Sequence, residues 1–302
     1  MFRNSYDSDN TTFSPQGKLH QVEYALEAVK QGSAAIGLRS ATHAVLLTLK
    51  RSTGELATYQ KKLIRIDDHV GVAIAGLTSD ARVLSNSMRQ QAMQSKMLYG
   101  RPIPVARAVQ GIADRAQNNT QQYGRRPYGV GFLVIGRDET GPHLFEFSPA
   151  GTAFEYYAHS IGARSQSAKT YLEQNFESFE NATLPELINH GLNALHDTLQ
   201  QDKHLTLQNT SIAIIGPASS EIENLDISGA AKRGNFRVWE NEHVDGLLRA
   251  WRRSRGEPED GPQEDTPAEA EAPAAEAQQT QEGSEQAPQG GAGAGEDVEM
   301  SG

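Results

Sequence analysis

The order of the apolar segments constrains the fold of this chain more than any other feature. Short runs typical of strands and longer amphipathic stretches typical of helices follow one another in blocks. Strand runs come first, then two helices, then strand runs, two helices and a last strand run. The expected strands are 34–38, 44–49, 63–66, 70–75, 130–136, 143–147, 152–157 and 211–215. The expected helices are 78–98, a stretch opening at Pro104, 168–176 and 184–199.

This order predicts an α+β fold of four layers. The four early strands are expected to form one antiparallel sheet, with the first helix pair on its outer face. The strands after residue 130 are expected to form a second sheet, which the second helix pair covers. Two such sheets stacked face to face give an αββα sandwich.

A turn and a further helix precede all of these strands. The tetrapeptide Ser14-Pro15-Gln16-Gly17 has proline at the second and glycine at the fourth position of a turn. Apolar residues then recur at spacings of three and four, which predicts an amphipathic helix that ends at Gly32. They are Leu19, Val22, Leu26 and Val29. A helix of about thirteen residues is marginal alone in water, so it needs a partner surface, and the periodicity alone favours an ordinary core helix.

Charge is distributed unevenly along the 302 residues. Residues 257–302 hold thirteen Asp and Glu and no Lys or Arg, so the net charge of −10 comes from this tail while residues 1–256 carry +3. The tail has no aromatic residue and cannot bury enough surface to offset its ordering entropy. We therefore expect a disordered acidic extension, with a partner-docking segment as the alternative. The nearly neutral body predicts no nucleic-acid partner.

Several site classes are excluded by composition. Cysteine is absent, which excludes disulfides, thiolate catalysis and cysteine-ligated zinc. The nine histidines lack the spacing of metal ligands, so we expect no metal and no cofactor. The chain has no basic-then-apolar leader, and its longest apolar run, 44–47, is too short to span a membrane. These features predict a soluble protein of a reducing compartment, without a membrane partner.

Five segments resemble the alpha subunits of the proteasome core particle. The first is 13–25, Phe-Ser-Pro-Gln-Gly-Lys-Leu-His-Gln-Val-Glu-Tyr-Ala. The others, in the family's order and spacing, are 28–33, 75–82, 123–131 and 161–168. The resemblance extends from Met1 to about Gly216 and implies the fold of N-terminal-nucleophile hydrolases. Residues 1–4, residues 60–62 and the acidic tail most resemble the type-1 branch, which occupies the sixth position of the alpha ring.

The resemblance also implies a division of the chain and a function. The division is a gate segment with a ring-packing helix at 1–32, an αββα domain with a C-terminal extension at 33–256, and the tail at 257–302. The implied function is that of a non-catalytic structural and gating subunit of the 20S proteasome, in ubiquitin-dependent and some ubiquitin-independent protein degradation. The implied partners are neighbouring alpha subunits in a heteroheptameric ring, the beta ring, the C-terminal tails of regulatory ATPases and other activators, and unfolded polypeptide in transit. The implied location is the cytoplasm and nucleus.

The family's functional residues carry over to two groups of positions. The expected gate cluster is Tyr6, Asp7, Pro15 and Tyr24. The expected pocket for regulator tails is Lys62, Gly17, Leu19 and Gly76. Taken singly, each of these residues could be an ordinary surface or helix residue. Many alpha subunits follow the Tyr-Asp pair with arginine, whereas this chain has Ser8, which removes a bidentate donor and a permanent charge. We therefore expect this segment to contribute to the open rim of the gate more than to its plug.

Catalysis by this chain is the competing hypothesis, because the fold also builds hydrolases. Ser33 could act as the nucleophile only if the chain began there, since its own α-amine would have to serve as the base. Ala34 stands where catalytic subunits usually carry a second threonine, and Leu49 where they carry an acid. An ammonium group at Lys62 would then have neither nucleophile nor acid to act on. We expect no catalytic residue, and a free-standing interaction module is the third possibility.

Overall fold

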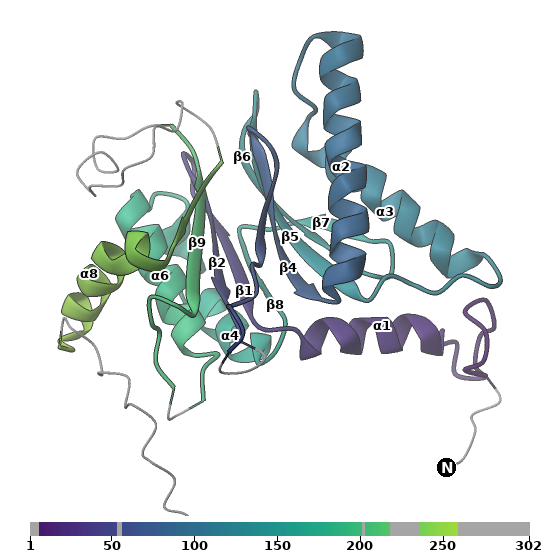
Figure 1. Ribbon diagram of the computed structural model, residues 1–302, viewed down its shortest axis with the longest axis horizontal. Coiled ribbons are helices and arrows are strands. Elements are labelled where there is room, and N and C mark those ends of the chain that lie inside the picture. Colours follow the sequence, from purple (N-terminus) through teal and green to yellow (C-terminus); the bar gives the residue numbers. More distant parts are fainter. Residues whose placement is uncertain (1–5, 53–55, 201–202, 218–235, 259–302) are drawn as a thin grey trace, which may run out of the picture. The chain divides into compact units, whose positions relative to one another are not determined.

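The computed structural model describes residues 6–52, 56–200, 203–217 and 236–258. Residues Met1–Gln263 form one compact unit, and a second unit, Glu264–Gly302, lies outside the described residues. The predictions for the acidic tail beyond residue 258 and for residues 1–4 fall outside the described residues as well. Within the first unit, two five-stranded sheets stack face to face with helices on both outer sides (Figure 1).

Both sheets are antiparallel throughout. The first has the strand order β10-β9-β2-β1-β8 and the second β3-β4-β5-β6-β7. The strands of the first sheet are β1 Ala35–Arg39, β2 Ala44–Leu49, β8 Ala158–Ile161, β9 Thr210–Ile215 and β10 Arg237–Glu240. Those of the second are β3 Leu63–Asp67, β4 Val70–Gly76, β5 Val130–Asp138, β6 Gly141–Phe147 and β7 Ala153–Glu155.

The pairing of the strands differs from the sequence prediction in two respects. The β3–β4 hairpin joins β5 and not the β1–β2 hairpin, because the chain crosses to the other sheet between β2 and β3. The strand predicted at 152–157 is reduced to β7, which pairs with β6, and the unpredicted β8 that follows it pairs with β1 in the opposite sheet. Hydrophobic periodicity identifies a strand but carries no information about its partner, which explains both errors.

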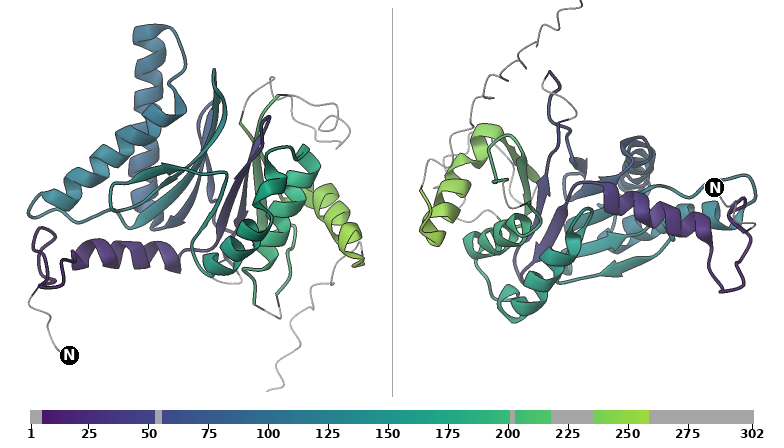
Figure 2. Two further views of the ribbon diagram at one scale, coloured as in Figure 1. Left: turned by 180° about the vertical axis from the view of Figure 1, so that it is seen from behind. Right: turned by 90° about the horizontal axis from the view of Figure 1, so that it is seen from below.

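Helices cover the outer face of each sheet and confirm the four-layer sandwich (Figures 1 and 2). α2 Thr78–Tyr99 and α3 Val105–Gln121 lie on the second sheet. α4 Ser165–Gln174, the short α5 Phe176–Phe179 and α6 Leu184–His196 lie on the side of the first. α6 begins with a capping box, in which the carboxylate of Glu186 accepts hydrogen bonds from the backbone N–H and the hydroxyl of Thr183 at 2.9 and 2.8 Å.

Three apolar clusters hold the layers together. One lies between the first sheet and its helices, one between the second sheet and its helices, and one between the two sheets. Their fully buried members include Leu47 and Leu192, Val72 and Ile112, and Leu46 and Leu133, respectively. Each such side chain contributes about 1.5–3 kcal/mol on burial, so the fold does not depend on any partner chain for a core.

The region after residue 217 holds elements that the sequence analysis does not predict. β10 extends the first sheet, and a 3-10 turn η1 Asn241–Val244 leads into α8 Asp245–Arg255. α8 buries Leu247, Leu248 and Trp251 in the first cluster. Four arginines in eleven residues lower its mean hydropathy, which explains why the apolar side was not recognised.

α1 His20–Gln31 stands apart from the four layers. It lies across the ends of the strands of the second sheet, against β4 and β5 (Figure 1). The predicted helix and its end at Gly32 are confirmed. Only Ala25 and Val29 are buried, and the other members of the apolar side are half-buried. They are Leu19, Val22 and Leu26. The apolar side of α1 is thus only partly covered within one chain.

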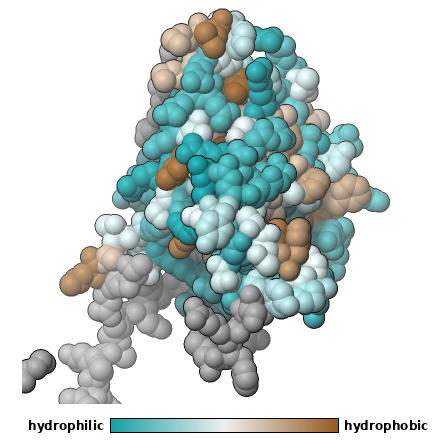
Figure 3. All heavy atoms as spheres, turned by 90° about the vertical axis from the view of Figure 1, so that its right-hand side faces the viewer, coloured by the Kyte–Doolittle hydropathy of each residue, from teal (hydrophilic) through white to brown (hydrophobic). Residues whose placement is uncertain are grey.

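The C-terminal half of α2 projects beyond the second sheet (Figure 1). Its large apolar side chains are exposed, with 64% of Met93 and 75% of Met97 accessible and Leu98 and Tyr99 similarly open. Figure 3 shows brown and tan spheres among teal ones at the top of the molecule. We call these four residues the α2 patch. An apolar group of this kind on a surface is typical of a contact with another protein.

Candidate functional site

The segment before α1 is anchored to the end of α3. Asn10 is buried, and its side-chain amide donates hydrogen bonds to the backbone carbonyls of Asn119 and Gln122, at 2.6 and 3.0 Å. Carbonyls at the end of a helix lack partners within the helix, so a side-chain donor is well placed there. Asn10 therefore caps α3 and fixes the N-terminal segment at the same time. The sequence analysis does not predict this contact, because 109 and more residues separate the partners.

Two members of the predicted gate cluster, Asp7 and Tyr24, are in contact. The hydroxyl of Tyr24 donates to the Asp7 carboxylate at 3.4 Å, and the side-chain amide of Gln21 donates to the Asp7 backbone carbonyl. Desolvation at the helix surface, followed by the negative charge of Asp7, raises the pKa of the Tyr24 phenol. The phenol therefore stays protonated at neutral pH and acts as the donor. Both side chains that bind Asp7 come from α1, so α1 holds the segment directly.

The other two members of the cluster, Tyr6 and Pro15, lie at the same end of α1 and are exposed. Within the described residues, no hydrogen bond or ring contact joins Tyr6 to Asp7 or Tyr24. Pro15 occupies the second position of the predicted turn, which the N–H of Gly17 closes by donating to the Ser14 carbonyl at 2.8 Å. Gly17 has a φ of +74°, a backbone conformation that glycine adopts without strain. The predicted turn is thus confirmed.

An ion pair between the exposed Arg126 and the buried Asp80 fixes the loop that follows α3. Arg126 donates to both carboxylate oxygens of Asp80, at 2.6 and 2.8 Å, and the N–H of Gly129 donates to the same carboxylate at 2.9 Å. The hydrogen bonds from Arg126 are the largest cause of a lowered Asp80 pKa. The loop between residues 122 and 129 therefore connects the start of α2 to the carbonyl that binds Asn10. The sequence analysis identified both segments only as family motifs and did not predict the pair.

Lys62 is buried at the other end of α1. Its ammonium group donates to the backbone carbonyl of Ser33, to the Ser33 hydroxyl at 2.7 Å and to the carbonyl of Ala34 at 3.4 Å. Burial, and then the positive charge of Arg51, lowers the pKa of Lys62 to about 7. Within the described residues no carboxylate pairs with this group. An anion that reached Lys62 would therefore find a donor that is desolvated and lacks a counter-charge.

The surroundings of Ser33 differ from those of a hydrolase nucleophile. Its nitrogen is in a peptide bond with Gly32, whose carbonyl accepts a hydrogen bond from the N–H of Ala163 at 2.6 Å. Ser33 and Lys62 are adjacent as in a catalytic pair, but Leu49 occupies the end of β2 where an acid would be needed. The α-amine that would act as the base is absent from this arrangement. The described geometry therefore offers no acid at the end of β2, and an α-amine would form only in a chain that began at Ser33.

A cavity of about 360 Å³ opens over Lys62. Gly76, Gln60, Thr78 and the last residues of α1 line it with Lys62. The predicted tail-pocket residues Lys62 and Gly76 thus share one cavity in this chain. Gly17 and Leu19 precede α1, and a helix of 12 residues separates them from this end by about 18 Å. A pocket containing all four predicted residues therefore cannot form within a single chain.

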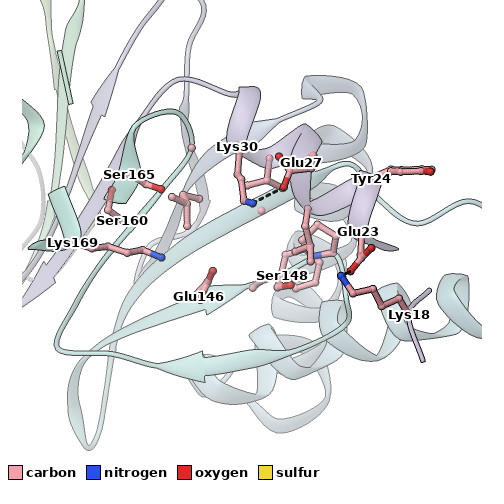
Figure 4. A pocket seen from close by; sticks show the side chains of 17 residues that line it. Lys18, Glu23, Tyr24, Glu27, Lys30, Glu146, Ser148, Ser160, Ser165 and Lys169 are labelled. Atoms are coloured by element: carbon pink, nitrogen blue, oxygen red, sulfur yellow. Dashed lines mark hydrogen bonds and ion pairs between the residues drawn. The ribbon is translucent and has the colours of Figure 1, made fainter. Parts of the chain in front are cut away.

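A groove of about 520 Å³ follows the side of α1 (Figure 4). Residues of α1 form one wall, and the end of β6, β8 and the start of α4 form the other. The charged and polar side chains around it are Lys18, Glu23, Glu27, Lys30, Glu146, Ser148, Ser160, Ser165 and Lys169. The half-buried Leu26 also lines the groove, so its apolar surface is open to a partner.

Comparison with known proteins identifies the family to which this chain belongs. Residues 29–215 match the family model described as proteasome subunit, and residues 6–28 match the N-terminal signature of A-type proteasome subunits. The chain belongs to the proteasome alpha subunit family. The signature covers the segment that Asn10 anchors and most of α1. The remaining match covers both sheets except β10, and all of the helices from α2 to α6.

Named relatives define the branch of the family more narrowly. The chain is 64% identical over 216 residues to a probable alpha type-6 proteasome subunit of Schizosaccharomyces pombe, covering 72% of this chain and 79% of the relative. It is 55% identical to the alpha type-1 proteasome subunit of Dictyostelium discoideum, covering 72% and 88%, and 55% identical to the alpha type-6 proteasome subunit of Saccharomyces cerevisiae, covering 72% and 93%. The relatives thus carry both type names.

Membrane and metal sites are absent from the described parts of the protein. No helix there is both long and apolar enough to cross a bilayer. No three His, Cys, Asp or Glu side chains in these ranges are grouped so that they could hold a metal ion.

Proposed function

We propose that this protein is a non-catalytic wall and gate element of the 20S proteasome, at the sixth position of a heteroheptameric alpha ring stacked on the beta ring. There it controls the entry of unfolded polypeptide and docks the C-terminal tails of regulatory ATPases and other activators, in ubiquitin-dependent and some ubiquitin-independent degradation. The sixth position rests on the resemblance to the type-1 branch. The same resemblance carries the proposal that the protein works in the cytoplasm and nucleus.

One observation carries the non-catalytic part of this proposal. The junction between Gly32 and Ser33 is folded into the protein, with the Gly32 carbonyl bound by Ala163 and Ser33 bound by Lys62. Removing the residues before Ser33 would remove α1, Asn10 and the anchored N-terminal segment together. An intact junction is therefore consistent with a subunit whose leader has a structural role, while other chains carry out peptide hydrolysis.

The uncovered surfaces of α1 support a place in a ring. The groove along α1 combines the open apolar side of Leu26 with paired charges such as Lys18 and Glu23, 3.0 Å apart. A contact in which different surfaces of neighbouring subunits meet can close into a ring. We infer that a neighbouring alpha subunit fills this groove. The α2 patch, on a different part of the protein, supplies a second surface for the rest of the particle.

The Lys62 cavity suits the carboxylate at the end of a regulator tail. An ammonium group in a desolvated site gains more from a carboxylate than an exposed one does. Lys62 and Gly76 line the cavity, whereas Gly17 and Leu19 lie at the far end of α1. We infer that the complete pocket lies between two subunits, with the residues that precede α1 supplied by the neighbour.

Mass measurements on the assembled particle test the proposal. We expect the full chain to purify in a particle far larger than its own 32.8 kDa, together with other proteasome subunits. We also expect the intact mass of the chain to include the residues before Ser33, with no covalent adduct after exposure to an electrophilic peptide. A lone monomer would contradict the ring assignment. A chain that begins at Ser33, or an adduct on its hydroxyl, would contradict the non-catalytic assignment.

A further inference from the structure

A second cavity, of about 650 Å³, lies beside the Lys62 cavity and is strongly basic. Four cationic side chains line it, and they come from three separate parts of the chain. They are Lys50 and Arg51 after β2, Arg164 before α4, and Lys203 in the loop that follows α6. Arg51 also lines the Lys62 cavity, so the two cavities share a wall. We call this second cavity the basic cavity.

The charges of the basic cavity are not balanced by the described residues. No Asp or Glu from these ranges lines it, and none of the four cations forms an ion pair there. Lys50 is buried, and its ammonium group donates to the side-chain oxygen of Asn241 at 3.3 Å. The carboxylate of Glu240 acts on Lys50 without lining the cavity, and it accepts a hydrogen bond from the Ser211 hydroxyl.

Of the four cations only Lys50 is buried, and some other charged groups of the protein have a partner of opposite charge. Asp80 is paired with Arg126, and Asp67 with Lys96. A group of like charges around one cavity is unfavourable because each charge repels the others at short range. A multivalent anion would relieve this repulsion. Among the described residues, the four cations of the basic cavity thus have no carboxylate beside them in the cavity lining.

The backbone beside the cavity adds to its positive character. Arg164 and Asn241 are the non-glycine residues with positive φ in the described ranges, and both border this site, one by lining it and the other by binding Lys50. Arg164 directly precedes α4. Its left-handed backbone conformation costs about 1 kcal/mol in folding free energy. α4 has no side-chain cap and no acidic residue in its first turn. The dipole of α4 therefore has its positive end one residue after Arg164, although the helix itself does not line the cavity.

We propose that the basic cavity binds a small polyphosphate, a ligand in which two or three linked phosphate groups carry three or more negative charges. The guanidinium groups of Arg51 and Arg164 match phosphate oxygens in a bidentate manner, and Lys50 and Lys203 add two ammonium groups. Four cations require several negative charges for balance, which one carboxylate or one phosphate does not supply. The site is distinct from Lys62, and its occupancy does not depend on the proposed role in gating.

Binding of sodium tripolyphosphate to the full chain tests this proposal by calorimetry at physiological ionic strength. We expect one saturable site. The double variant Arg164→Gln with Lys203→Gln should weaken binding about tenfold or more, because it removes two charge-assisted contacts. The matched control is Arg101→Gln with Arg107→Gln, which removes the same charge from exposed arginines near the start of α3 and should leave the affinity unchanged. Lys203→Glu, an exposed charge reversal, serves if the first variant fails to fold.

Two further ligands define the chemistry. Citrate carries three carboxylates, and we expect it to bind much more weakly than tripolyphosphate. ATP in the presence of a chelator distinguishes the sources, because displacement of tripolyphosphate by ATP indicates a nucleotide and failure to displace it indicates an inorganic chain. No saturable binding, equal losses in the pocket and control variants, or citrate binding as tightly as tripolyphosphate would contradict the proposal.

Discussion

The two ends of α1 are held in opposite ways. At the C-terminal end, the backbone of Gly32 packs directly on Gly76, and Lys62 is buried beneath it. At the N-terminal end, the segment is held by polar side-chain contacts, of which those of Asn10 and Ser14 involve buried residues and that of Tyr24 is exposed. Few buried apolar contacts and exposed hydrogen bonds are typical of a region with low local stability. We therefore expect the C-terminal end of α1 to form a fixed receptor, and the segment at its N-terminal end to be able to change its position.

The glycines at the two ends give the largest expected contrast. A methyl group on Gly32 would lie 2.3 Å from the backbone nitrogen of Gly76, so we expect Gly32→Ala to lower the free energy of unfolding by about 3 kcal/mol or more. Gly17 has no atom within 4 Å of such a methyl group, and Gly17→Ala should cost only about 1 kcal/mol, from its positive φ. Thermal unfolding of both variants measures this. Equal losses would mean that the C-terminal end is not the rigid one.

The pH dependence of regulator-tail binding is expected to be the next largest effect. With a Lys62 pKa of about 7, the ammonium form is lost as the pH rises through 7, and a bound carboxylate restores it. We therefore expect the affinity of the assembled particle for a tail peptide to fall by up to about tenfold per pH unit above 7, with proton uptake on binding. Calorimetry in buffers of different ionisation enthalpy measures both quantities.

The control for this prediction is Lys62→Gln, which should bind the peptide weakly and without that pH dependence.

The lowered pKa of Lys62 also affects the stability of the fold, but stability should rise with pH where peptide affinity falls. Because the unfolded chain binds the proton up to its ordinary pKa of 10.5, the free energy of unfolding should increase between pH 7 and that value. A wild-type affinity that stays constant from pH 6 to 9 would exclude Lys62 as the carboxylate receptor.

The smallest effect is expected at the gate end. Tyr24→Phe removes one long, exposed hydrogen bond to Asp7, so activator-stimulated peptide entry should change by about twofold or less. Asp7→Ala removes the acceptor completely and should lower stimulated entry further, while assembly stays intact. Hydrolysis of a fluorogenic peptide by particles that carry each variant gives the comparison. Unchanged entry in the Asp7 variant would count against its gate assignment.

The parts of this structure that follow from local sequence were predictable. The turn at Gly17, the span of α1 and most strands and helices were identified from periodicity and turn residues. Partners in the sheets were not, since the side-chain pattern of β4 is the same whether its neighbour is β5 or β1. α8 was not predicted because its four arginines lower the mean hydropathy of a segment that contains three buried apolar side chains.

The candidate sites show the same difference between features that local sequence predicts and contacts that it does not. Lys62 and Gly76 were recognised through family resemblance and line one cavity, whereas Gly17 and Leu19 do not line it, and the role of the pocket stays a prediction. The burial of Lys62 and its lowered pKa depend on residues distant in sequence, such as Arg51 and Ser33, and no local pattern encodes them. The same holds for Asn10 on α3 and for the Asp80–Arg126 pair. Long-range polar contacts are the part of a site that a single sequence does not reveal.

The α2 patch bears on the life of this protein before it joins a particle. Met93, Met97, Leu98 and Tyr99 are exposed on a helix end that stands clear of the sheet. A newly made copy presents this adhesive surface to solvent until a partner covers it, and surfaces of this kind promote self-association. If a neighbouring subunit covers this surface, as proposed, assembly would also protect this polypeptide from aggregation.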